Sequence, residues 1–483
     1  MSTANAPRLE HTFATELEGL YTAHQPPGFE APSLLLLNRT LATELGLDPA
    51  WLEEHGAAAL SGSELPPGTR PLAQVYAGHQ FGHFNPQLGD GRALLLGEVV
   101  DPQGRRFDLQ LKGAGTTPYS RNGDGRAGLD SVLREYIVSE AMYALGIPTT
   151  RSLAAVTTGE RVVRQRIAPG AVLTRVAASH IRVGTLEYFA SRKLKSELRR
   201  LVDYTLRRHY PDQADAPNQA KALLDAVGKA QAELVAQWML VGFVHGVMNT
   251  DNVTLSGETI DYGPCAFMEQ YDPRTVFSQI DHQGRYAFGN QPGIGAWNLA
   301  RMAEALLNLL AVDEDRAVAM AQESLDQFGA TVQGNWTSGM RKKLGLAGEE
   351  ATDEALVKDL LDWMQRNHTD YTSAFRKLSR SLVEGGAAFE GDEFSAWNER
   401  WRSRLGGADL QETAAAMDRV NPLYIVRGHK IEEALDAAIA GHLGPTEAMI
   451  DVLSRPFEEQ PGAEAYAEPA PADFGPYSTH CNT

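Results

Sequence analysis

The stretch HGVMNTDNVTLSGETIDYG, residues 245–263, decides how this chain folds. It contains an amide, Asn252, followed by a carboxylate, Asp261. Both side chains offer oxygen atoms, the ligands that Mg²⁺ prefers, and phosphate groups and waters commonly complete the shell of that ion. The stretch therefore predicts a loop that binds a divalent cation together with a phosphate-bearing ligand. A plainer interpretation of the same two residues is a pair of turn caps around a hairpin.

The spacing within this stretch is typical of a kinase-type active centre. There, a loop His-x-Asp, four further residues and Asn supply a base and a metal ligand, and a following Asp-Phe-Gly supplies a second metal ligand. In this chain Val247 occupies the base position after His245, and valine cannot accept a proton. Asp251 could act as the base instead if it lies within hydrogen-bond reach of an attacking hydroxyl. Its alternative role is to orient the metal site.

Strand patterns precede helical patterns along the chain. Residues 93–100 and 107–113 read as two strands joined by a turn, and apolar residues at a period near 3.6 predict a helix over residues 129–145. Residues 152–177 are rich in β-forming residues, and helical patterns dominate over residues 186–443. We therefore predict an α+β, protein-kinase-like two-lobe fold with a small β-rich N-lobe and a large helical C-lobe.

Composition divides the chain into four parts. Residues 1–71, broken by Pro and Gly, are predicted to form an N-terminal extension, residues 72–180 the kinase-like N-lobe, and residues 181–454 the helical C-lobe. Residues 455–483 are rich in Pro, Ala, Glu and Gly and are predicted to form a flexible tail without a core of its own.

Two glycine-rich segments are candidates for phosphate contact. Gly89 and Gly91 precede a predicted strand, where the missing side chains let backbone N–H groups approach phosphates, and Arg92 adds positive charge. Asp124 and Gly125 lie in a second glycine-rich loop, before the predicted helix. The first segment is equally consistent with an ordinary turn, and the second fits a nucleotide lid or a plain connection.

Charged residues of the predicted N-lobe and its border are candidates for nucleotide binding. Lys112 ends the second strand, where a kinase-type fold places its phosphate-binding lysine. Glu135 and Glu140, on the helix that follows, compete to pair with it, and helical periodicity favours Glu140. Arg175 and Arg182 flank the passage from sheet to helices and could clamp a triphosphate through bidentate contacts. Taken singly, each would be an ordinary surface residue.

The bulk composition bounds the partners. Of the 483 residues, 62 are acidic and 44 basic, and the resulting net charge of -18 repels nucleic-acid backbones and anionic membranes. No apolar run is long enough to span a bilayer, and the N-terminal sequence does not read as a targeting signal. We expect a cytoplasmic protein, a monomer by default, whose two cysteines, Cys265 and Cys481, are normally thiols.

Several long motifs resemble the selenoprotein O family of protein adenylyltransferases, and the resemblance covers nearly the whole chain. The motifs are QLGDGRA, LQLKGAGTTPYSRNGDGRA, LREYIVSEAMYALGIPTTRSLA, HGVMNTDN, DYGPCAFMEQYDP, DHQGRYAFGNQPGIGAWNLARMAEAL and NPLYIVRGHKIEEAL. The resemblance implies a kinase-like fold that binds ATP in a reversed orientation and transfers AMP to protein hydroxyls. On that reading the usual base position, here Val247, is no longer needed.

The resemblance also implies a role for each matching residue. It makes Asn252 and Asp261 the ligands of Mg²⁺ or Mn²⁺ and Asp251 the proton acceptor, and it gives Lys112 the partner Glu135, against the periodicity argument. The residues that it assigns to ATP contact are Gly89, Gly91, Arg92, Lys112, Asp124, Gly125, Arg175, Arg182 and Asp261. Client proteins with Ser, Thr or Tyr hydroxyls would accept the AMP.

Members of this family are described as redox-controlled through a cysteine near the C-terminus. By resemblance, Cys481 would form a reversible disulfide with Cys265; the alternative is that the two are unrelated free thiols. Two other functions fit the residues: a kinase-like phosphotransferase, and a catalytically inactive nucleotide-binding scaffold whose tail governs partner binding.

Overall fold

An antiparallel sheet organises the N-terminal part of the chain in a computed structural model that describes residues 6–164 and 166–480. Seven strands follow one another in the order β1-β3-β6-β7-β10-β9-β2, and β8 pairs with β10. The strands are β1 (Tyr21–Ala23), β2 (Ser33–Leu37), β3 (Leu72–Gln74), β6 (Ala93–Val100), β7 (Arg106–Lys112), β8 (Ala127–Gly128), β9 (Arg151–Val163) and β10 (Ile167–Ala177). The predicted hairpin is confirmed, since β6 pairs with β7 in a register that sets Ala93 opposite Lys112.

Residues before position 71 complete this sheet. They supply both of its edge strands, β1 and β2, so the segment predicted to be an extension contributes strands to the sheet. Three short helices accompany them: α1 (Thr12–Glu16), α2 (Arg39–Glu44) and α3 (Pro49–Ala59). Leu41, Trp51 and Leu52 of these helices pack with Leu153 and Val176 of the central strands, which buries the outer face of the sheet.

Helix α4 (Leu129–Ala144) joins the sheet to the rest of the molecule. It confirms the helix predicted from periodicity, and it packs on β9 and β10 as well as on two helices near the C-terminus, α14 and α15. Residues of α4 such as Leu133 and Ile137 belong to the same buried cluster as Trp238 and Trp401 from the helical part. Because both sides of α4 are covered, its apolar residues do not form a single stripe.

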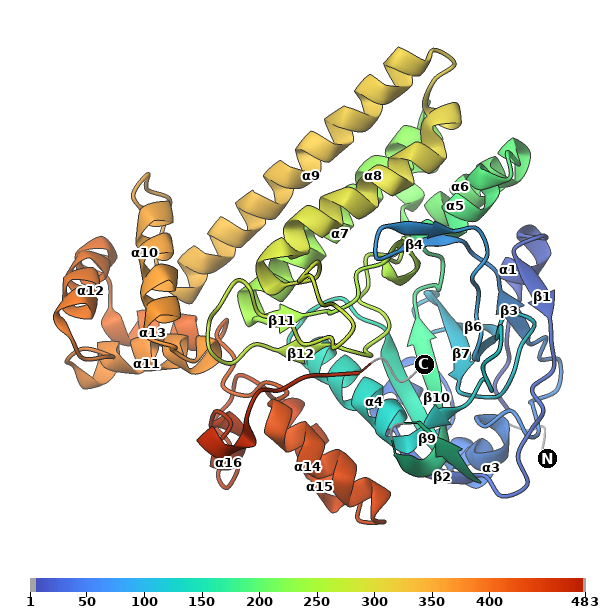
Figure 1. Cartoon of the computed structure of the whole chain (residues 1–483), viewed down its shortest axis with the longest axis horizontal. Helices are drawn as coiled ribbons and strands as arrows, with labels where there is room; N and C mark the ends of the chain where they lie inside the picture. Colours follow the sequence, from blue (N-terminus) through green and yellow to red (C-terminus); the bar gives the residue numbers. More distant parts are fainter. Residues whose placement is uncertain (1–5, 165, 481–483) are drawn as a thin grey trace.

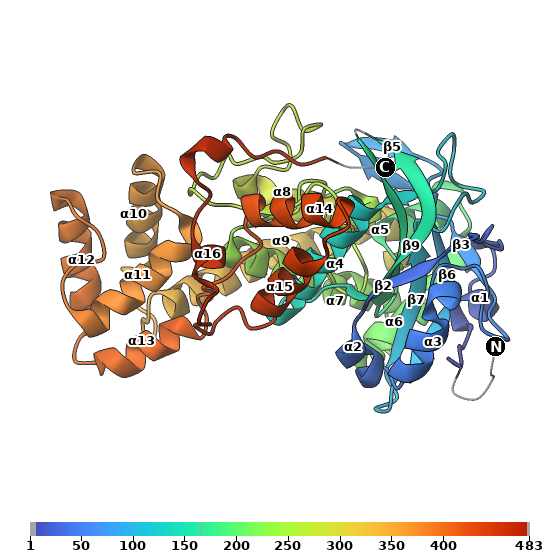
Figure 2. The same ribbon diagram turned by 90° about the horizontal axis from the view of Figure 1, so that it is seen from below.

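The remainder of the chain is largely helical. Figure 1 shows the long helices α7, α8 and α9 lying alongside one another, and in Figure 2 the sheet and the group α10–α13 lie at opposite ends. The helices are α5 (Val183–Ser191), α6 (Lys195–His209), α7 (Gln219–Val241), α8 (Gln291–Leu310), α9 (Glu314–Lys343), α10 (Asp353–Arg366), α11 (Tyr371–Glu384), α12 (Asp392–Leu405), α13 (Leu410–Asp418), α14 (Gly428–Ile439), α15 (Gly444–Leu453) and α16 (Glu464–Ala467). The fold is therefore mixed α/β, with a sheet-containing N-terminal region and a helical C-terminal region.

The tail after α15 follows a defined course in this structure. Beyond α16 it turns back toward the sheet (Figure 1), and Thr479 pairs with residues 277–279 through Thr479 N to Phe277 O at 2.8 Å and Gln279 N to Thr479 O at 3.1 Å. Within the tail that composition predicts to be flexible, Thr479 is thus paired through its backbone with another part of the chain. No helix in the described part of the chain has the length and apolar character needed to cross a membrane.

Candidate active site

A buried ion pair marks the inner end of β7. The antiparallel pairing of β7 with β6 and β10 fixes the backbone of Lys112, and its Nζ lies 2.6 Å from Oε2 of Glu135 on α4. Glu140 lies elsewhere, where it accepts hydrogen bonds from Arg151 at 2.9 and 2.7 Å and from the backbone N of Ser152 at 2.9 Å. The preference for Glu140 from periodicity was therefore wrong, because α4 is covered on both sides and its apolar face does not mark the side of Lys112.

Three cations converge on the carboxylate of Asp261. Its Oδ1 accepts hydrogen bonds from Lys112 Nζ at 2.7 Å and from Arg175 at 2.6 Å, and its Oδ2 accepts one from Arg182 at 3.2 Å. Burial alone would raise the pKa of Asp261, but the three positive charges outweigh burial and hold it well below its ordinary value. This carboxylate is therefore ionised throughout the physiological pH range.

The two arginines belong to the buried cluster, not to the surface. Arg175 on β10 also contacts Glu135 Oε1 at 3.2 Å and Gln110 Oε1 at 2.6 Å. Arg182, at the start of α5, lies over the ring of Tyr76 at 4.6 Å and donates to the backbone O of Asp251 at 2.8 Å. Each is about 2% exposed. Arg182 thereby joins the segment that carries Asp261 to the segment that carries Asp251.

The loop of residues 245–252 is anchored at both ends. His245 follows the short strand β11 (Phe243–Val244), and its Nε2 donates to the backbone O of Ile260 at 2.9 Å. At the other end, Asn252 Nδ2 donates to Val247 O at 3.0 Å, which commits the amide nitrogen and leaves the amide oxygen as the atom able to coordinate a cation. Val247 is buried, in keeping with a structural role at the position where a kinase has its base.

Asp251 has the environment of a proton acceptor. Its Oδ2 accepts a hydrogen bond from Gln80 Nε2 at 3.1 Å, while no group among the described residues donates to its buried Oδ1. Burial raises the pKa of Asp251 to about 6, although the positive charge of Arg182 opposes that shift. A carboxylate with a pKa near neutrality is well matched to general base catalysis.

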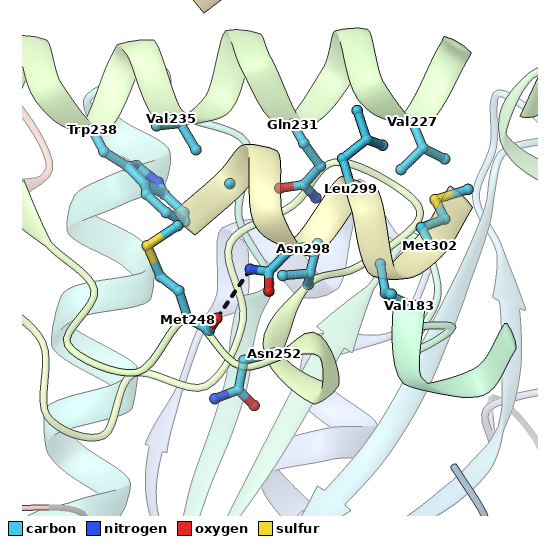
Figure 3. Close-up of a pocket in the computed structure, with 12 residues that line it drawn as sticks. Val183, Val227, Gln231, Val235, Trp238, Met248, Asn252, Asn298, Leu299 and Met302 are labelled. Carbon is cyan, nitrogen blue, oxygen red and sulfur yellow. Dashed lines mark hydrogen bonds between the residues drawn. The ribbon is translucent and has the colours of Figure 1, made fainter. Parts of the chain in front are cut away.

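A small apolar cavity lies behind Asn252, between α7 and α8 (Figure 3). Its volume is about 20 Å³, which is room for about one water molecule and far too little for a nucleotide. Asn298 of α8 lies at its edge and donates from Nδ2 to Met248 O at 3.0 Å (Figure 3). The cavity is thus part of the packing that supports the loop.

The two glycine-rich segments lie against each other. Gly89 has φ +135°, and a Cβ there would stand 2.6 Å from Tyr119 Cγ, so only glycine fits beneath that ring. At Gly91 a Cβ would lie 3.0 Å from Tyr119 O. Arg92 follows at the edge of β6, where its backbone O accepts from Gly113 N at 2.7 Å. The loop that carries Tyr119 therefore covers the turn at residues 89–91.

Asp124 and Gly125 lie at the outer end of that same loop. Asp124 is exposed and forms a bidentate pair with Arg164, with contacts of 2.6 and 3.0 Å. Gly125 has φ +67° and abuts the backbone of Gly115. None of the contacts described for these two residues reaches the cluster around Asp261.

Cys265 follows the segment that carries Asp261 and lies next to the docked tail. It is 1% exposed, and burial raises the pKa of its thiol to about 12, which keeps the sulfur protonated. Thr479 Oγ1 donates to the backbone O of Pro264, the neighbour of Cys265, at 2.7 Å. The proposed partner Cys481 lies outside the described residues.

Sequence reasoning missed several polar residues of the site. Asp90, between the two glycines, accepts from Gln74 N at 3.1 Å and from Gln110 Nε2 at 3.2 Å and lies 3.8 Å from Arg182. Burial raises the pKa of Asp90 despite that arginine. Gln80 contacts Asp251 from a separate hairpin. In the motif Gly89-Asp90-Gly91, the two glycines were interpreted as phosphate contacts and Asp90 was not considered. No sequence pattern around Gln80 distinguishes it from other polar residues.

With respect to metal ions, no group of three or more His, Cys, Asp or Glu side chains that could hold an ion occurs in residues 6–164 and 166–480. Asn252 offers an amide oxygen and Asp261 offers a carboxylate. This donor set fits Mg²⁺ or Mn²⁺ whose shell is completed by phosphates, because such ions use few protein ligands at nucleotide sites.

Comparison with known proteins identifies the family. The sequence model described as "Protein adenylyltransferase SelO" matches residues 6–454. Proteins named "Protein nucleotidyltransferase YdiU" are similar over nearly their full length: one from Cereibacter sphaeroides is 58% identical over 99% of both chains, and one from Halalkalibacterium halodurans is 55% identical over 96% of this chain and 95% of its own. The chain therefore belongs to the SelO family of protein adenylyltransferases and is an enzyme, a nucleotidyltransferase.

Proposed function

We propose that this enzyme transfers AMP from ATP to Ser, Thr or Tyr hydroxyls of client proteins on a kinase-like two-lobe scaffold. On this proposal residues 72–180 act as the N-lobe and residues 181–454 as the C-lobe, and the ends of the chain are extensions. The observation that carries it is the buried cluster in which Lys112, Arg175 and Arg182 all contact Asp261. Ammonium and guanidinium groups held in one place by such contacts suit a polyphosphate, whose oxygens accept the hydrogen bonds that these groups donate.

The positive residues would bind and orient the phosphates of ATP. Lys112 is held by Glu135 at 2.6 Å, so its ammonium group is fixed before ATP arrives. Arg175 and Arg182 are buried and hydrogen-bonded, so they need little reorganisation to stabilise charge on the departing pyrophosphate. Two further segments would contact the nucleotide through backbone groups and charged side chains. They are the turn at Gly89, Gly91 and Arg92 and the loop at Asp124 and Gly125.

Asn252 and Asp261 would hold Mg²⁺ or Mn²⁺. When bound, such an ion neutralises phosphate charge and polarises the P–O bond that breaks. The amide nitrogen of Asn252 is already committed to Val247 O, so its oxygen is oriented for that role. Asp261 is ionised at neutral pH because of its three cationic neighbours, and a carboxylate must be ionised to bind a metal.

Asp251 would act as the general base. The acceptor hydroxyl oxygen would form a bond to the α-phosphorus while the bond from that phosphorus to the bridging oxygen of the β-phosphate breaks. Pyrophosphate leaves, and the hydroxyl proton passes to the carboxylate of Asp251. Attack at the α-phosphorus corresponds to the reversed binding of ATP that the family resemblance implies.

We further propose redox control through Cys265 and Cys481. Oxidation of the two thiols by a disulfide or peroxide would form one S–S bond and release two protons and two electrons to the oxidant. The contact of Thr479 with Pro264 at 2.7 Å supports the proposal, since it brings the tail to the neighbour of Cys265. The enzyme would act as a monomer in the cytoplasm. The reducing conditions there would keep both sulfurs as thiols, and the enzyme would be active in that state.

Labelled ATP tests the reaction. The α-phosphate label should enter the protein itself or proteins of a cell extract, and the γ-phosphate label should not. Incorporation of the γ-label alone would make the enzyme a phosphotransferase, and incorporation of neither would leave a nucleotide-binding scaffold. Asp261→Ala should abolish α-label transfer, and transfer by that variant at the wild-type rate would contradict the metal role of Asp261.

A further inference from the structure

A hairpin from the N-terminal region reaches the loop that carries Asp251. Its strands are β4 (Gly78–Gln80) and β5 (His83–Asn85), with Phe81 at φ 51° and Gly82 at φ 84° in the turn. In Figure 1 the blue segment labelled β4 extends from the sheet toward the helical region, where β4 contacts α5 and residues 250–252. The hairpin thus belongs to one half of the molecule and packs on the other.

Three consecutive hairpin residues bind three consecutive loop residues. His79 N donates to Thr250 Oγ1 at 2.7 Å, Gln80 Nε2 donates to Asp251 Oδ2 at 3.1 Å, and Phe81 N donates to Asn249 Oδ1 at 3.0 Å. That list covers every residue of the loop from 249 to 251. The hairpin therefore holds each of the loop residues 249–251. Of the three hydrogen bonds, only the one from Gln80 is donated by a side chain, and only that one reaches the carboxylate of Asp251.

A buried glutamate fixes the first of these contacts. Thr250 Oγ1, which accepts from His79 N, donates in turn to Glu187 Oε2 at 2.6 Å. The other oxygen of Glu187, Oε1, lies 2.5 Å from His79 Nδ1. Because these polar groups satisfy one another, the β4 strand has one defined position on the loop. Gln80 is therefore presented to Asp251 by a rigid support.

Close packing also limits Asp251 from the hairpin side. A Cβ at Gly78 would stand 3.2 Å from both Cβ and Oδ1 of Asp251. That distance is tighter than an ordinary van der Waals contact, so a side chain at position 78 would require Asp251 to shift slightly. The carboxylate thus has Gly78 on one side, the donor Gln80 at Oδ2, and the arginine that holds its backbone, Arg182, on another. Of its two oxygens, Oδ1 is the one that has no donor among the described residues.

We propose that Gln80 is a positioning residue for Asp251. By holding Oδ2, it keeps the plane of the carboxylate fixed in the orientation that receives the proton of the acceptor hydroxyl. The inference rests on the proposed function, since it presupposes that Asp251 is the base. Gln80 contacts no proposed metal or phosphate ligand in this structure, so its effect should fall on the chemical step and not on ATP binding.

Gln80→Met tests the proposal, since methionine keeps the length of the side chain and removes the donor. We expect kcat for α-label transfer to fall about 10- to 100-fold, in the range that misplacement of a catalytic group produces, with KM for ATP unchanged. Gln87→Met is the matched control, because Gln87 is an exposed residue of the same segment; its kcat should equal that of the wild type. Equal thermal unfolding temperatures for both variants would exclude misfolding.

A double-mutant cycle adds a readout that a purely structural role would not give. Asp251→Asn should retain a slow residual rate, since a general base contributes about 10²- to 10⁴-fold. Adding Gln80→Met to that variant should lower the residual rate no further, because Gln80 acts through Asp251. An undiminished kcat for Gln80→Met, a raised KM for ATP, or an additional loss in the double variant would overturn the proposal. Absence of α-label transfer by the wild type would instead refute the proposed function itself.

Discussion

Glu135→Gln, compared with Glu140→Gln, separates the catalytic role of the ion cluster from its contribution to stability. Glu135 binds Lys112 at 2.6 Å through one oxygen and Arg175 at 3.2 Å through the other. Glutamine keeps one acceptor oxygen, so one of these two contacts is lost and an N–H group faces a cation in its place. A hydrogen bond to a charged group contributes about 1.5–3 kcal/mol.

The lost hydrogen-bond free energy should lower the rate of AMP transfer, because Lys112 is no longer held in position to bind the phosphates. At about 1.4 kcal/mol for each tenfold change, kcat/KM for α-label transfer should fall about 10- to 100-fold. Glu140→Gln provides the matched control on the same helix, since Glu140 also makes charged contacts, at 2.9 and 2.7 Å to Arg151, but none of its described contacts reaches the cluster.

The assay is the initial rate of α-label incorporation over a range of ATP concentrations, with thermal unfolding of both variants measured in parallel. The two variants should lose similar stability, while only Glu135→Gln loses transfer activity. If Glu135→Gln transferred AMP at the wild-type rate, or Glu140→Gln lost as much activity, the assignment of Glu135 as the partner of Lys112 in catalysis would be refuted.

Two further predictions concern buried groups that take no part in the proposed reaction. Burial lowers the pKa of Lys343 to about 7 from 10.5, so the unfolded chain binds more protons between those values and wild-type stability should rise with pH across that window. Lys343→Met should remove about 2 kcal/mol of the change in unfolding free energy between pH 7 and pH 9, measured by urea denaturation, whereas a Lys342→Met control that behaved the same way would contradict this assignment. Cys265, whose thiol is buried, should resist iodoacetamide in the native enzyme and react once the enzyme is unfolded, as mass mapping would record; rapid native labelling would disprove its protection.

Local patterns predicted the elements that local patterns determine. The β6–β7 hairpin and α4 were predicted because alternation and the 3.6-residue period are properties of neighbouring residues. Lys112 could be singled out for the same reason, since it ends a predicted strand. Its partner could not be derived from periodicity, because α4 is covered by the sheet on one side and by α14 and α15 on the other, and the family resemblance was needed to favour Glu135.

Contacts between distant segments were beyond reach of the local sequence. Gln80 meets Asp251 across a separation of 171 residues, from a strand of only three residues that has no detectable period. The pairing of Thr479 with residues 277–279 uses backbone atoms, and the composition of the tail carries no information about such contacts. In both cases the determining geometry arises only when segments far apart in the sequence pack together.

The latch formed by residues 79–81 limits how the two halves of the enzyme move. To rock apart, they must give up the three hydrogen bonds to residues 249–251, at about 1 kcal/mol each. A total of about 3 kcal/mol leaves roughly one molecule in a hundred unlatched at equilibrium. Nucleotide exchange is therefore expected to proceed while these hydrogen bonds remain formed, and the two halves are expected to stay in contact between turnovers.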